Sequence, residues 1–198
     1  MISARLRVFK ELFLPADDPE SDLPQTIESK RAFSGRLINV RLDTVTTPDG
    51  ATGVREVVEH PGAVLLIALD DQDNVLLVRQ YRHPVGKRLF ELPAGTLDEG
   101  EDPRTCAERE LREETGYRPR SLEELGGFFL SPGYCNEYIH VFLATGLEES
   151  PLDTGDEDDL AALRLPLAEA LRMVERGEIQ DAKSLAALLM LSRRRVLP

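Results

Sequence analysis

The stretch that decides the fold runs from Gly95 to Tyr117 and reads GTLDEGEDPRTCAERELREETGY. Within it, Asp102 is a residue type favoured as a helix N-cap, and Pro103 suits the first helical position. Gly116 stands where the left-handed residue that ends many helices would lie. These signals predict a helix of roughly three and a half turns, preceded by a glycine-containing loop.

Three glutamates of this expected helix share one face. Glu110, Glu113 and Glu114 are spaced i, i+3 and i+4, so their carboxylates repel one another, each like-charged pair costing about 0.2–0.5 kcal/mol. A hard divalent cation would offset this repulsion, because Mg²⁺ takes oxygen ligands from one or two carboxylates and leaves its other positions to water and phosphates. The alternative is a solvated helix face with salt bridges, which is the commoner reason for a run of charges.

The neighbours of this cluster favour a metal site over a solvated face. Glu101 lies just before the helix, and Arg109 directly precedes the glutamates, where its guanidinium can hold a carboxylate in a bidentate pair. With Gly95, these residues resemble the Nudix box, whose pattern is Gly-x5-Glu-x7-Arg-Glu-(apolar)-x-Glu-Glu-x-Gly-(apolar). Every charged and glycine position matches, and only the final apolar position departs, where Tyr117 replaces the usual aliphatic residue.

The composition is typical of one soluble domain with a short extension. The chain has 198 residues, 41% hydrophobic and 30% charged. Its net charge of −12 argues against a nucleic-acid partner, because proteins that bind nucleic acid present a basic face. No apolar stretch has the length of a membrane span, so we expect no membrane association. Cys106 and Cys135 are too few for a disulfide framework and are expected as thiols in the cytoplasm.

The pattern of turns and apolar runs divides the chain into three parts. Residues 1–27 are expected to form an N-terminal extension, 28–59 the strands of a small antiparallel sheet suited to dimer formation, and 60–198 the main domain. Further strands are expected where apolar or alternating runs are bounded by turn residues. These strands span 63–69, 75–78, 89–92, 125–130, 138–144 and 160–165.

Two helices are expected after the last strand. Pro166 begins the first, which ends before Gly177, and the second spans 181–194. The core-facing stripe of this second helix is expected to consist of Ala182, Leu185, Leu189 and Ser192. Strands flanked by the box helix and these two helices indicate a layered α/β fold. The Nudix resemblance implies an α/β/α sandwich with a mixed sheet, plus the small N-terminal antiparallel sheet.

Outside the box, the chain resembles the ADP-ribose pyrophosphatase branch of the Nudix family over about residues 28–193. The stretches that carry this likeness are RQYR (79–82) with ELPAG (91–95), SPGYCNE (131–137), and GDEDD (155–159) with GEIQDAKS (177–184). The resemblance implies a homodimer that hydrolyses the diphosphate of ADP-ribose to AMP and ribose 5-phosphate with Mg²⁺, or with Mn²⁺ in its place. Two alternatives stay open. One is hydrolysis of another nucleoside diphosphate sugar or a dinucleotide, and the other is a nucleotide-sensing module without activity, which would be expected to have a broken box.

The resemblance also implies roles for individual residues. The metal ligands would be the Ala94 carbonyl and the carboxylates of Glu110, Glu114 and Asp159. The residues taking part in catalysis would be Glu157, Glu113 and Arg109, with Glu101 orienting the metal ligands. The residues that contact substrate would be Arg82 at a phosphate, Arg55 reaching a site across the dimer, Glu91, Glu137, and Phe33 against the adenine. For Phe33, an ordinary strand residue is the alternative.

The catalytic base is expected in the acidic loop before the last strand, because metal-bound carboxylates are poor proton acceptors. The loop is one residue shorter than the family pattern, so two alignments are open. Aligned on its first residues, the loop makes Glu157 the base and Asp159 a metal ligand. Aligned on Leu160, it makes Asp156 the base and Asp158 the ligand. We choose Glu157 because the longer side chain reaches further; a merely solvated loop is the alternative.

The choice of Glu157 predicts the kinetics of a single variant. Glu157→Gln should lower kcat by about 10²–10⁴-fold with KM little changed, because a general base acts in the transition state and not in substrate binding. Steady-state kinetics on the purified variants would measure both constants. A nearly normal Glu157→Gln enzyme beside an inactive Asp156→Asn or Asp159→Asn enzyme would show that the other alignment is right.

Overall fold

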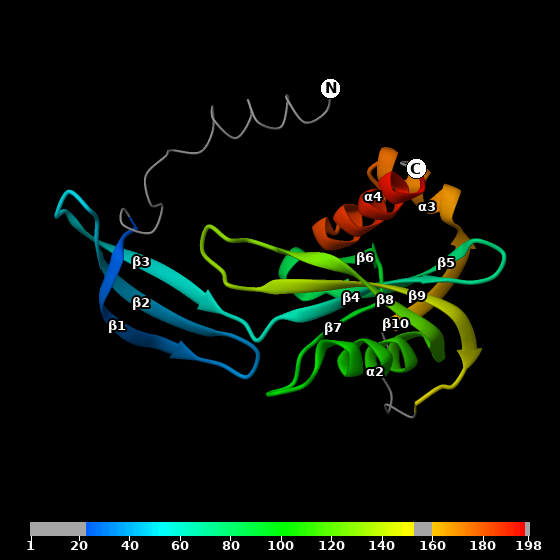
Figure 1. Ribbon diagram of the computed structural model, residues 1–198, viewed down its shortest axis with the longest axis horizontal. Helices are drawn as coiled ribbons and strands as arrows, with labels where there is room; N and C mark the ends of the chain where they lie inside the picture. The colour runs from blue at the N-terminus through cyan, green and yellow to red at the C-terminus, as the bar shows by residue number, and fades with distance from the viewer. Residues whose placement is uncertain (1–22, 153–159, 197–198) are drawn as a thin grey trace, which may run out of the picture. The chain divides into compact units, whose positions relative to one another are not determined.

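A computed structural model of the protein describes residues 23–152 and 160–196 (Figure 1). The chain separates into two compact units between Glu59 and His60, and each unit is described by itself. No helix in the described part of the chain combines the length and the apolar character needed to cross a lipid bilayer.

The N-terminal unit is a three-stranded antiparallel sheet. Its strands are β1 (Gln25–Ser34), β2 (Asn39–Thr46) and β3 (Thr52–Glu59), in the order β1-β2-β3. A turn that begins at Gly35 joins β1 to β2, and a turn at Pro48-Asp49-Gly50 joins β2 to β3, where Gly50 adopts a left-handed φ of 81°. Every residue of β1 is exposed, so this sheet has almost no core of its own.

The second unit contains a mixed sheet of seven strands. The path runs β10-β5-β4-β9-β8, while β6 pairs with β5 and β7 pairs with β4. Among the described residues, β4 and β9 form the parallel pair and the other pairs are antiparallel. The strands are β4 (Ala63–Leu69), β5 (Asn74–Arg82), β6 (Lys87–Glu91), β7 (Ala94–Thr96), β8 (Tyr117–Phe129), β9 (Tyr138–Glu149) and β10 (Leu160–Pro166).

Helices cover both faces of the mixed sheet (Figure 1). They are α2 (Pro103–Thr115) on one face, and α3 (Leu167–Glu175) and α4 (Ala182–Val196) on the other; a short 3₁₀ helix, η1 (His83–Val85), follows β5. The strand β4 is buried at every position, because alternate side chains of a strand enter opposite layers. Leu65 and Ile67 join the α3/α4 layer, and Val64 and Leu66 join the α2 layer. The predicted α/β/α sandwich is confirmed.

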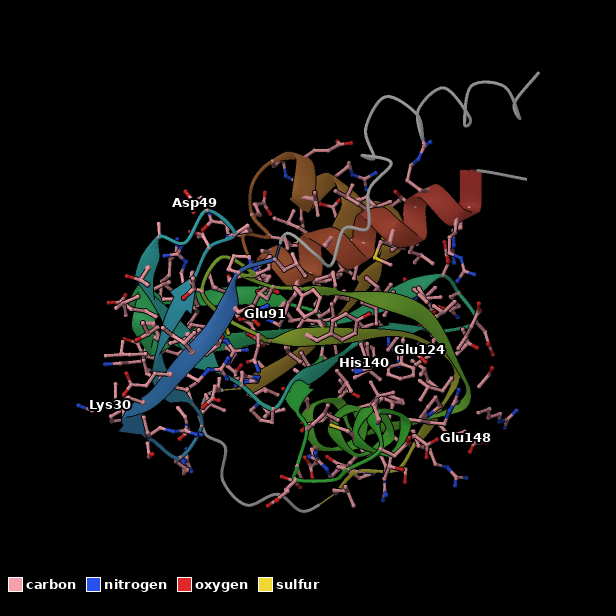
Figure 2. All side chains as sticks on the ribbon, turned by 60° about the vertical axis from the view of Figure 1, so that its left-hand side comes forward. Lys30, Asp49, Glu91, Glu124, His140 and Glu148 are labelled. Atoms are coloured by element: carbon pink, nitrogen blue, oxygen red, sulfur yellow. The ribbon has the colours of Figure 1, made fainter. Side chains whose placement is uncertain are left out.

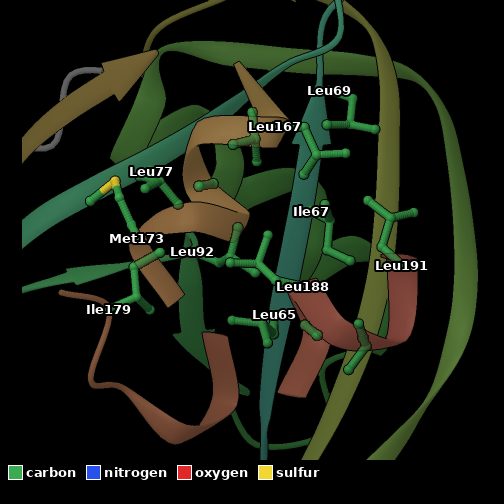
Figure 3. Packing of buried hydrophobic residues seen from close by; sticks show 14 of the residues in the cluster. Leu65, Ile67, Leu69, Leu77, Leu92, Leu167, Met173, Ile179, Leu188 and Leu191 are labelled. Atoms are coloured by element: carbon green, nitrogen blue, oxygen red, sulfur yellow. The ribbon is translucent and has the colours of Figure 1, made fainter. Parts of the chain in front are cut away.

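The stripe expected for the last helix is only partly right. Leu185 is half-buried and packs against the core, but Ala182 and Leu189 are exposed, Leu189 by 51%. The buried face of α4 consists instead of Ser184, Ala187, Leu188 and Leu191. Figure 3 shows Leu188 and Leu191 in the cluster with Leu65, Ile67 and Leu92. In the first turn of α4, the buried residue is Ser184, at a position where a simple amphipathic pattern would have an apolar residue. The apolar pattern alone therefore indicates the wrong face of the helix.

The corrected stripe predicts opposite results for two leucines two positions apart. Leu191→Ala should lower the free energy of unfolding by about 2–5 kcal/mol, because it leaves a cavity in the core. Leu189→Ala should change it by less than about 0.5 kcal/mol, as is usual at an exposed position. Urea unfolding followed by far-UV circular dichroism would measure both. Equal losses in the two variants would contradict this helix phase.

Candidate active site

The helix α2 begins and ends at the residues that the sequence indicates. The Asp102 side chain accepts hydrogen bonds from the backbone N–H groups of Arg104 and Thr105, each at 3.1 Å. Gly116 is left-handed with φ 77° and donates its N–H to the Arg112 carbonyl. Both ends of the helix are therefore fixed locally, and this sets which residues of the box face the strand β7.

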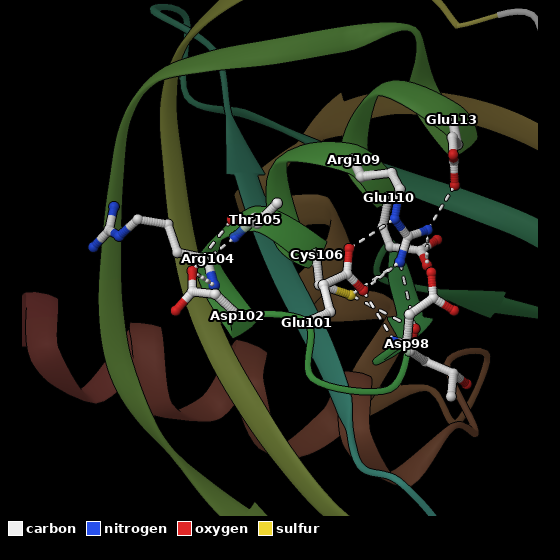
Figure 4. Close-up of polar contacts among 10 residues, drawn as sticks. Asp98, Glu101, Asp102, Arg104, Thr105, Cys106, Arg109, Glu110 and Glu113 are labelled. Carbon is white, nitrogen blue, oxygen red and sulfur yellow. Dashed lines mark hydrogen bonds and ion pairs between the residues drawn. The ribbon is translucent and has the colours of Figure 1, made fainter.

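Arg109 lies at the centre of the carboxylate cluster (Figure 4). It binds Glu101 with Nε at 3.0 Å and with a terminal nitrogen at 2.8 Å, and its other terminal nitrogen contacts Glu110 at 2.7 Å and Glu113 at 3.0 Å. The guanidinium therefore offsets much of the repulsion that the spacing of the glutamates predicts. It also holds the pKa of Glu101 at about 2, chiefly through its hydrogen bonds.

Glu114, the fourth glutamate of the cluster, is held by the strand β7. Its Oε2 accepts the backbone N–H of Ala94 at 2.9 Å, which ties the end of α2 to β7. Burial and, to a smaller extent, the nearby charge of Glu110 raise the pKa of Glu114 to about 8, although the hydrogen bond from Ala94 acts to lower it. A positive charge placed beside this carboxylate would favour its ionised form.

Glu110 occupies space that only a glycine leaves open. A Cβ atom built on Gly95 would lie 1.8 Å from the Glu110 carboxyl carbon, so any side chain at position 95 would displace this carboxylate. Burial also raises the pKa of Glu110, an effect that the hydrogen bond from Arg109 opposes. The glycine of the box therefore makes room for a metal-ligand candidate, in addition to its part in the loop.

The donor set fits a hard divalent cation. Glu110 and Glu114 are one turn apart on α2, both are costly to ionise as they stand, and carboxylate oxygens are the ligands that Mg²⁺ prefers. Within residues 23–152 and 160–196, no three acidic, histidine or cysteine side chains converge as a ready metal cage. Mg²⁺ needs only one or two carboxylates when substrate phosphates and water complete its shell. Asp159 and Glu157, assigned from the sequence, lie outside the described residues.

A second polar cluster surrounds Glu91, labelled in Figure 2. Its side chain is 1% exposed, and its two oxygens accept from Arg82 Nε and a terminal Arg82 nitrogen, both at 2.8 Å. Lys183 Nζ contacts the same carboxylate at 2.5 Å. Burial acts to raise the pKa of Glu91, but the hydrogen bonds from Arg82 and the charge of Lys183 outweigh it and lower the pKa. Glu91 therefore orients Arg82, whose side chain stays 40% exposed.

The remaining candidates for substrate contact belong to different units of the chain. Glu137 precedes β9, is 20% exposed, and lies 3.9 Å from His60 Nδ1. Phe33 is on β1 with 55% exposure, and Arg55 is on β3, where its guanidinium donates to the Val54 carbonyl at 3.3 Å. Both belong to the N-terminal unit. Sequence reasoning assigned no role to Lys183; the only signal was the resemblance of GEIQDAKS to a family helix.

This fold and this box helix are those of a Nudix domain. The NUDIX domain family matches residues 59–188, and the family described as nucleoside diphosphate sugar hydrolase N-terminal domain matches residues 25–58. The chain belongs to the Nudix hydrolase family, whose members generally use a divalent metal ion. A solved structure titled as an ADP compounds hydrolase has a TM-score of 0.77 over 86% of this chain and 92% of that chain, at 24% identity, which shows the fold alone.

Named relatives cover most of the chain. An ADP-ribose pyrophosphatase of Mycobacterium tuberculosis is 44% identical over 83% of this chain and 81% of its own length. An ADP-ribose pyrophosphatase of Bacillus subtilis is 37% identical over 87% of this chain and 95% of its own. A methanol dehydrogenase activator of Bacillus methanolicus is 43% identical over 83% of this chain and 90% of its own.

The pair between Glu101 and Arg109 predicts a pH-dependent loss of stability. Because the pKa of Glu101 falls from 4.5 to about 2 on folding, its ionised form stabilises the protein above about pH 4.5, and this stabilisation is lost as the pH falls through about 2. Glu101→Gln should therefore lower the free energy of unfolding at pH 7 by about 1–3 kcal/mol. The deficit relative to the parent protein should shrink below pH 4.5.

Urea unfolding at several pH values would measure this difference. Glu99→Gln is the matched control, since Glu99 is an exposed glutamate of the same loop, and it should change stability little at any pH. A Glu101→Gln deficit that stays constant from pH 7 to pH 3 would contradict the ionic character of the pair.

Proposed function

We propose that this chain is a Mg²⁺-dependent pyrophosphohydrolase, able to use Mn²⁺, that cleaves ADP-ribose to AMP and ribose 5-phosphate. The observation that carries the proposal is the partial burial of Glu110 and Glu114 on one face of α2, beside Gly95 and Ala94, with both pKa values raised. The relatives named ADP-ribose pyrophosphatase, at 37% and 44% identity, support the choice of substrate.

In this proposal, Glu110 and Glu114 hold the metal ion together with the Ala94 carbonyl and Asp159. When bound, the divalent ion would supply the positive charge that the diphosphate oxygens and the two partly buried carboxylates require. The chain's part is to keep these ligands in place. Arg109 fixes Glu110 and Glu113 through hydrogen bonds of 2.7 and 3.0 Å, and the Ala94 N–H fixes Glu114.

The reaction adds one water molecule across a P–O bond. Glu157 takes a proton from the water, the water oxygen bonds to one phosphorus, and the bond from that phosphorus to the bridging oxygen breaks. The bridging oxygen leaves on the other phosphate, so the products are AMP and ribose 5-phosphate. Arg82, oriented by Glu91, donates to a phosphate oxygen and offsets its charge. Glu137 contacts the substrate from the loop before β9.

We also propose a homodimer formed through the N-terminal sheet. Ile27, Phe33 and Val54 are 61%, 55% and 60% exposed on this sheet, and an isolated small sheet without a covered apolar face is only marginally stable. A second copy of the chain would cover these residues. The family resemblance adds that Arg55 would then reach the partner's active site, with Phe33 stacking on the adenine.

The cytoplasm is the proposed place of action. Cys106 and Cys135 are both free thiols, as expected in a reducing compartment. Cys106 is fully buried, and burial raises the pKa of its thiol, which leaves it unreactive.

The second candidate is hydrolysis of another nucleoside diphosphate sugar. GDP-mannose pyrophosphatases of Cronobacter sakazakii and Shigella flexneri are 34% and 32% identical to this chain over 81% and 77% of its length. A sensing module without activity is the remaining alternative, and the complete box argues against it. Because one relative is named a methanol dehydrogenase activator, the experiment below also tests for a protein without hydrolase activity.

A substrate panel would separate these functions. The protein would be incubated with Mg²⁺ or Mn²⁺ and with ADP-ribose, ADP-glucose, GDP-mannose, a dinucleotide or a nucleoside triphosphate, and the products identified by mass. We expect ADP-ribose to be cleaved fastest, giving AMP and ribose 5-phosphate in equal amounts. A preference for GDP-mannose or a triphosphate would contradict the proposed substrate, and no cleavage of any compound would contradict the enzyme.

Two controls belong to the same experiment. Glu114→Gln should remove most activity and weaken Mn²⁺ binding, whereas Glu108→Gln, at an exposed position of the same helix, should change neither. The molar mass of the assayed protein, measured by light scattering, should be twice the 22.1 kDa of one chain. A fully active protein of single-chain mass would contradict the proposed dimer.

A further inference from the structure

The segment from Glu91 to Ala94 joins β6 to β7 and is held at every residue. Glu91 binds Arg82 and Lys183, the Pro93 carbonyl accepts the Leu66 N–H at 2.9 Å, and the Ala94 N–H binds Glu114. This short segment therefore lies between the two polar clusters of the candidate site. Its position decides where the Glu114 carboxylate and the Arg82 guanidinium lie relative to each other.

The backbone N–H of Leu92 is satisfied from outside the sheet. Its partner is Ser184 Oγ, at 2.8 Å, across 92 positions of sequence. Both residues are 0% exposed, so no solvent is at hand to replace this acceptor. A buried N–H without a partner is energetically costly, so the segment would be expected to move if this acceptor were lost.

Ser184 is in turn fixed by the first turn of α4. Its Oγ donates to Asp181 Oδ2 at 2.6 Å, and its backbone N–H donates to the same oxygen at 3.0 Å. The other Asp181 oxygen contacts Lys183 Nζ at 2.9 Å. Asp181 therefore caps α4 and orients the serine hydroxyl at once. The hydroxyl therefore donates its proton to Asp181 and accepts the N–H of Leu92.

We propose that Ser184 is a positioning residue of the active site, which acts through Leu92 to hold Ala94 and Glu114 in metal-binding geometry. Ser184 touches neither substrate nor metal in this scheme. The inference rests on the proposed function only for the identity of the reaction, because the hydrogen bonds that carry it lie within the protein. It also explains why the buried stripe of α4 contains a serine where a simple core would contain an aliphatic residue.

The competing explanation is that Ser184 only stabilises the first turn of α4. This explanation predicts that replacing Ser184 lowers stability but leaves metal affinity unchanged. Ser184→Ala removes the acceptor of the Leu92 N–H, and Ser184→Thr retains a hydroxyl. Leu191→Ala is the matched structural control, because Leu191 lies on the same buried face of α4, in the same cluster, two turns from Ser184. Leu191 has no part in the site.

Two measurements without substrate test the positioning role. Hydrogen exchange of the Leu92 amide, followed in the metal-free protein, should become at least about 10-fold faster in Ser184→Ala than in Leu191→Ala at equal global stability. The Kd for Mn²⁺ should rise by about 10–100-fold in Ser184→Ala, the usual range when a group that supports metal ligands is lost. Ser184→Thr should restore both values, and Leu191→Ala should leave the Kd for Mn²⁺ unchanged.

Kinetics then separate this inference from the proposed function. With ADP-ribose, Ser184→Ala should lower kcat more than it changes KM at limiting Mg²⁺, and Ser184→Thr should recover kcat. A Ser184→Ala protein within about twofold of the parent in Mn²⁺ affinity would overturn the positioning role even if ADP-ribose is the substrate. Equal losses in Leu191→Ala, or no recovery in Ser184→Thr, would also overturn it. A parent protein whose Mn²⁺ affinity depends on Ser184, but which cleaves no compound, would overturn only the proposed function.

Discussion

Partial burial of two carboxylates, Glu110 and Glu114, against the strand β7 is the constraint on which the rest of the site depends. Glu110 needs the missing side chain of Gly95, because a Cβ there would lie 1.8 Å from its carboxyl carbon. Glu114 needs the Ala94 N–H, and its pKa near 8 shows that this one hydrogen bond does not offset its burial. Helix, loop and strand must therefore meet in one arrangement before either group can bind a cation.

The features of the fold and the site that could be predicted from the sequence are those that depend on residues close together in the chain. The ends of α2 were predictable because Asp102 and Gly116 act within a few residues of themselves. The carboxylate cluster was predictable for the same reason, since its spacing is helical. The hold of Arg109 on Glu101 spans eight positions and follows the pattern of the box. A layered α/β fold was expected from apolar runs such as β4 together with the helices, whereas the three-layer sandwich was implied by the Nudix resemblance.

The features that sequence reasoning missed depend on distant contacts. The bonds from Lys183 to Glu91 and from Leu92 to Ser184 each span 92 positions, so no local pattern signals them. They also explain the wrong stripe in α4, where a buried serine breaks the apolar period. The first half of β8 was missed for a related reason: it is polar, and its backbone pairing with the distant β9 makes it a strand. Exposed ion pairs of Arg118 and Arg120 with Glu148 join the two strands there.

The charges of the site argue that substrate and cation must act together. Glu101, Glu110 and Glu113 share the single guanidinium of Arg109, and Glu114 lies near Glu110 on the same helix, in a chain of net charge −12. The charge of Arg82 is largely matched by Glu91, and that of Lys183 is shared between Glu91 and Asp181. A diphosphate that entered this site without a cation would meet more negative than positive charge. In the proposed site, a bound divalent ion would reverse the local sign and favour the ionised form of Glu114, so the cost of burying that carboxylate would be offset only in the proposed complex with metal and substrate.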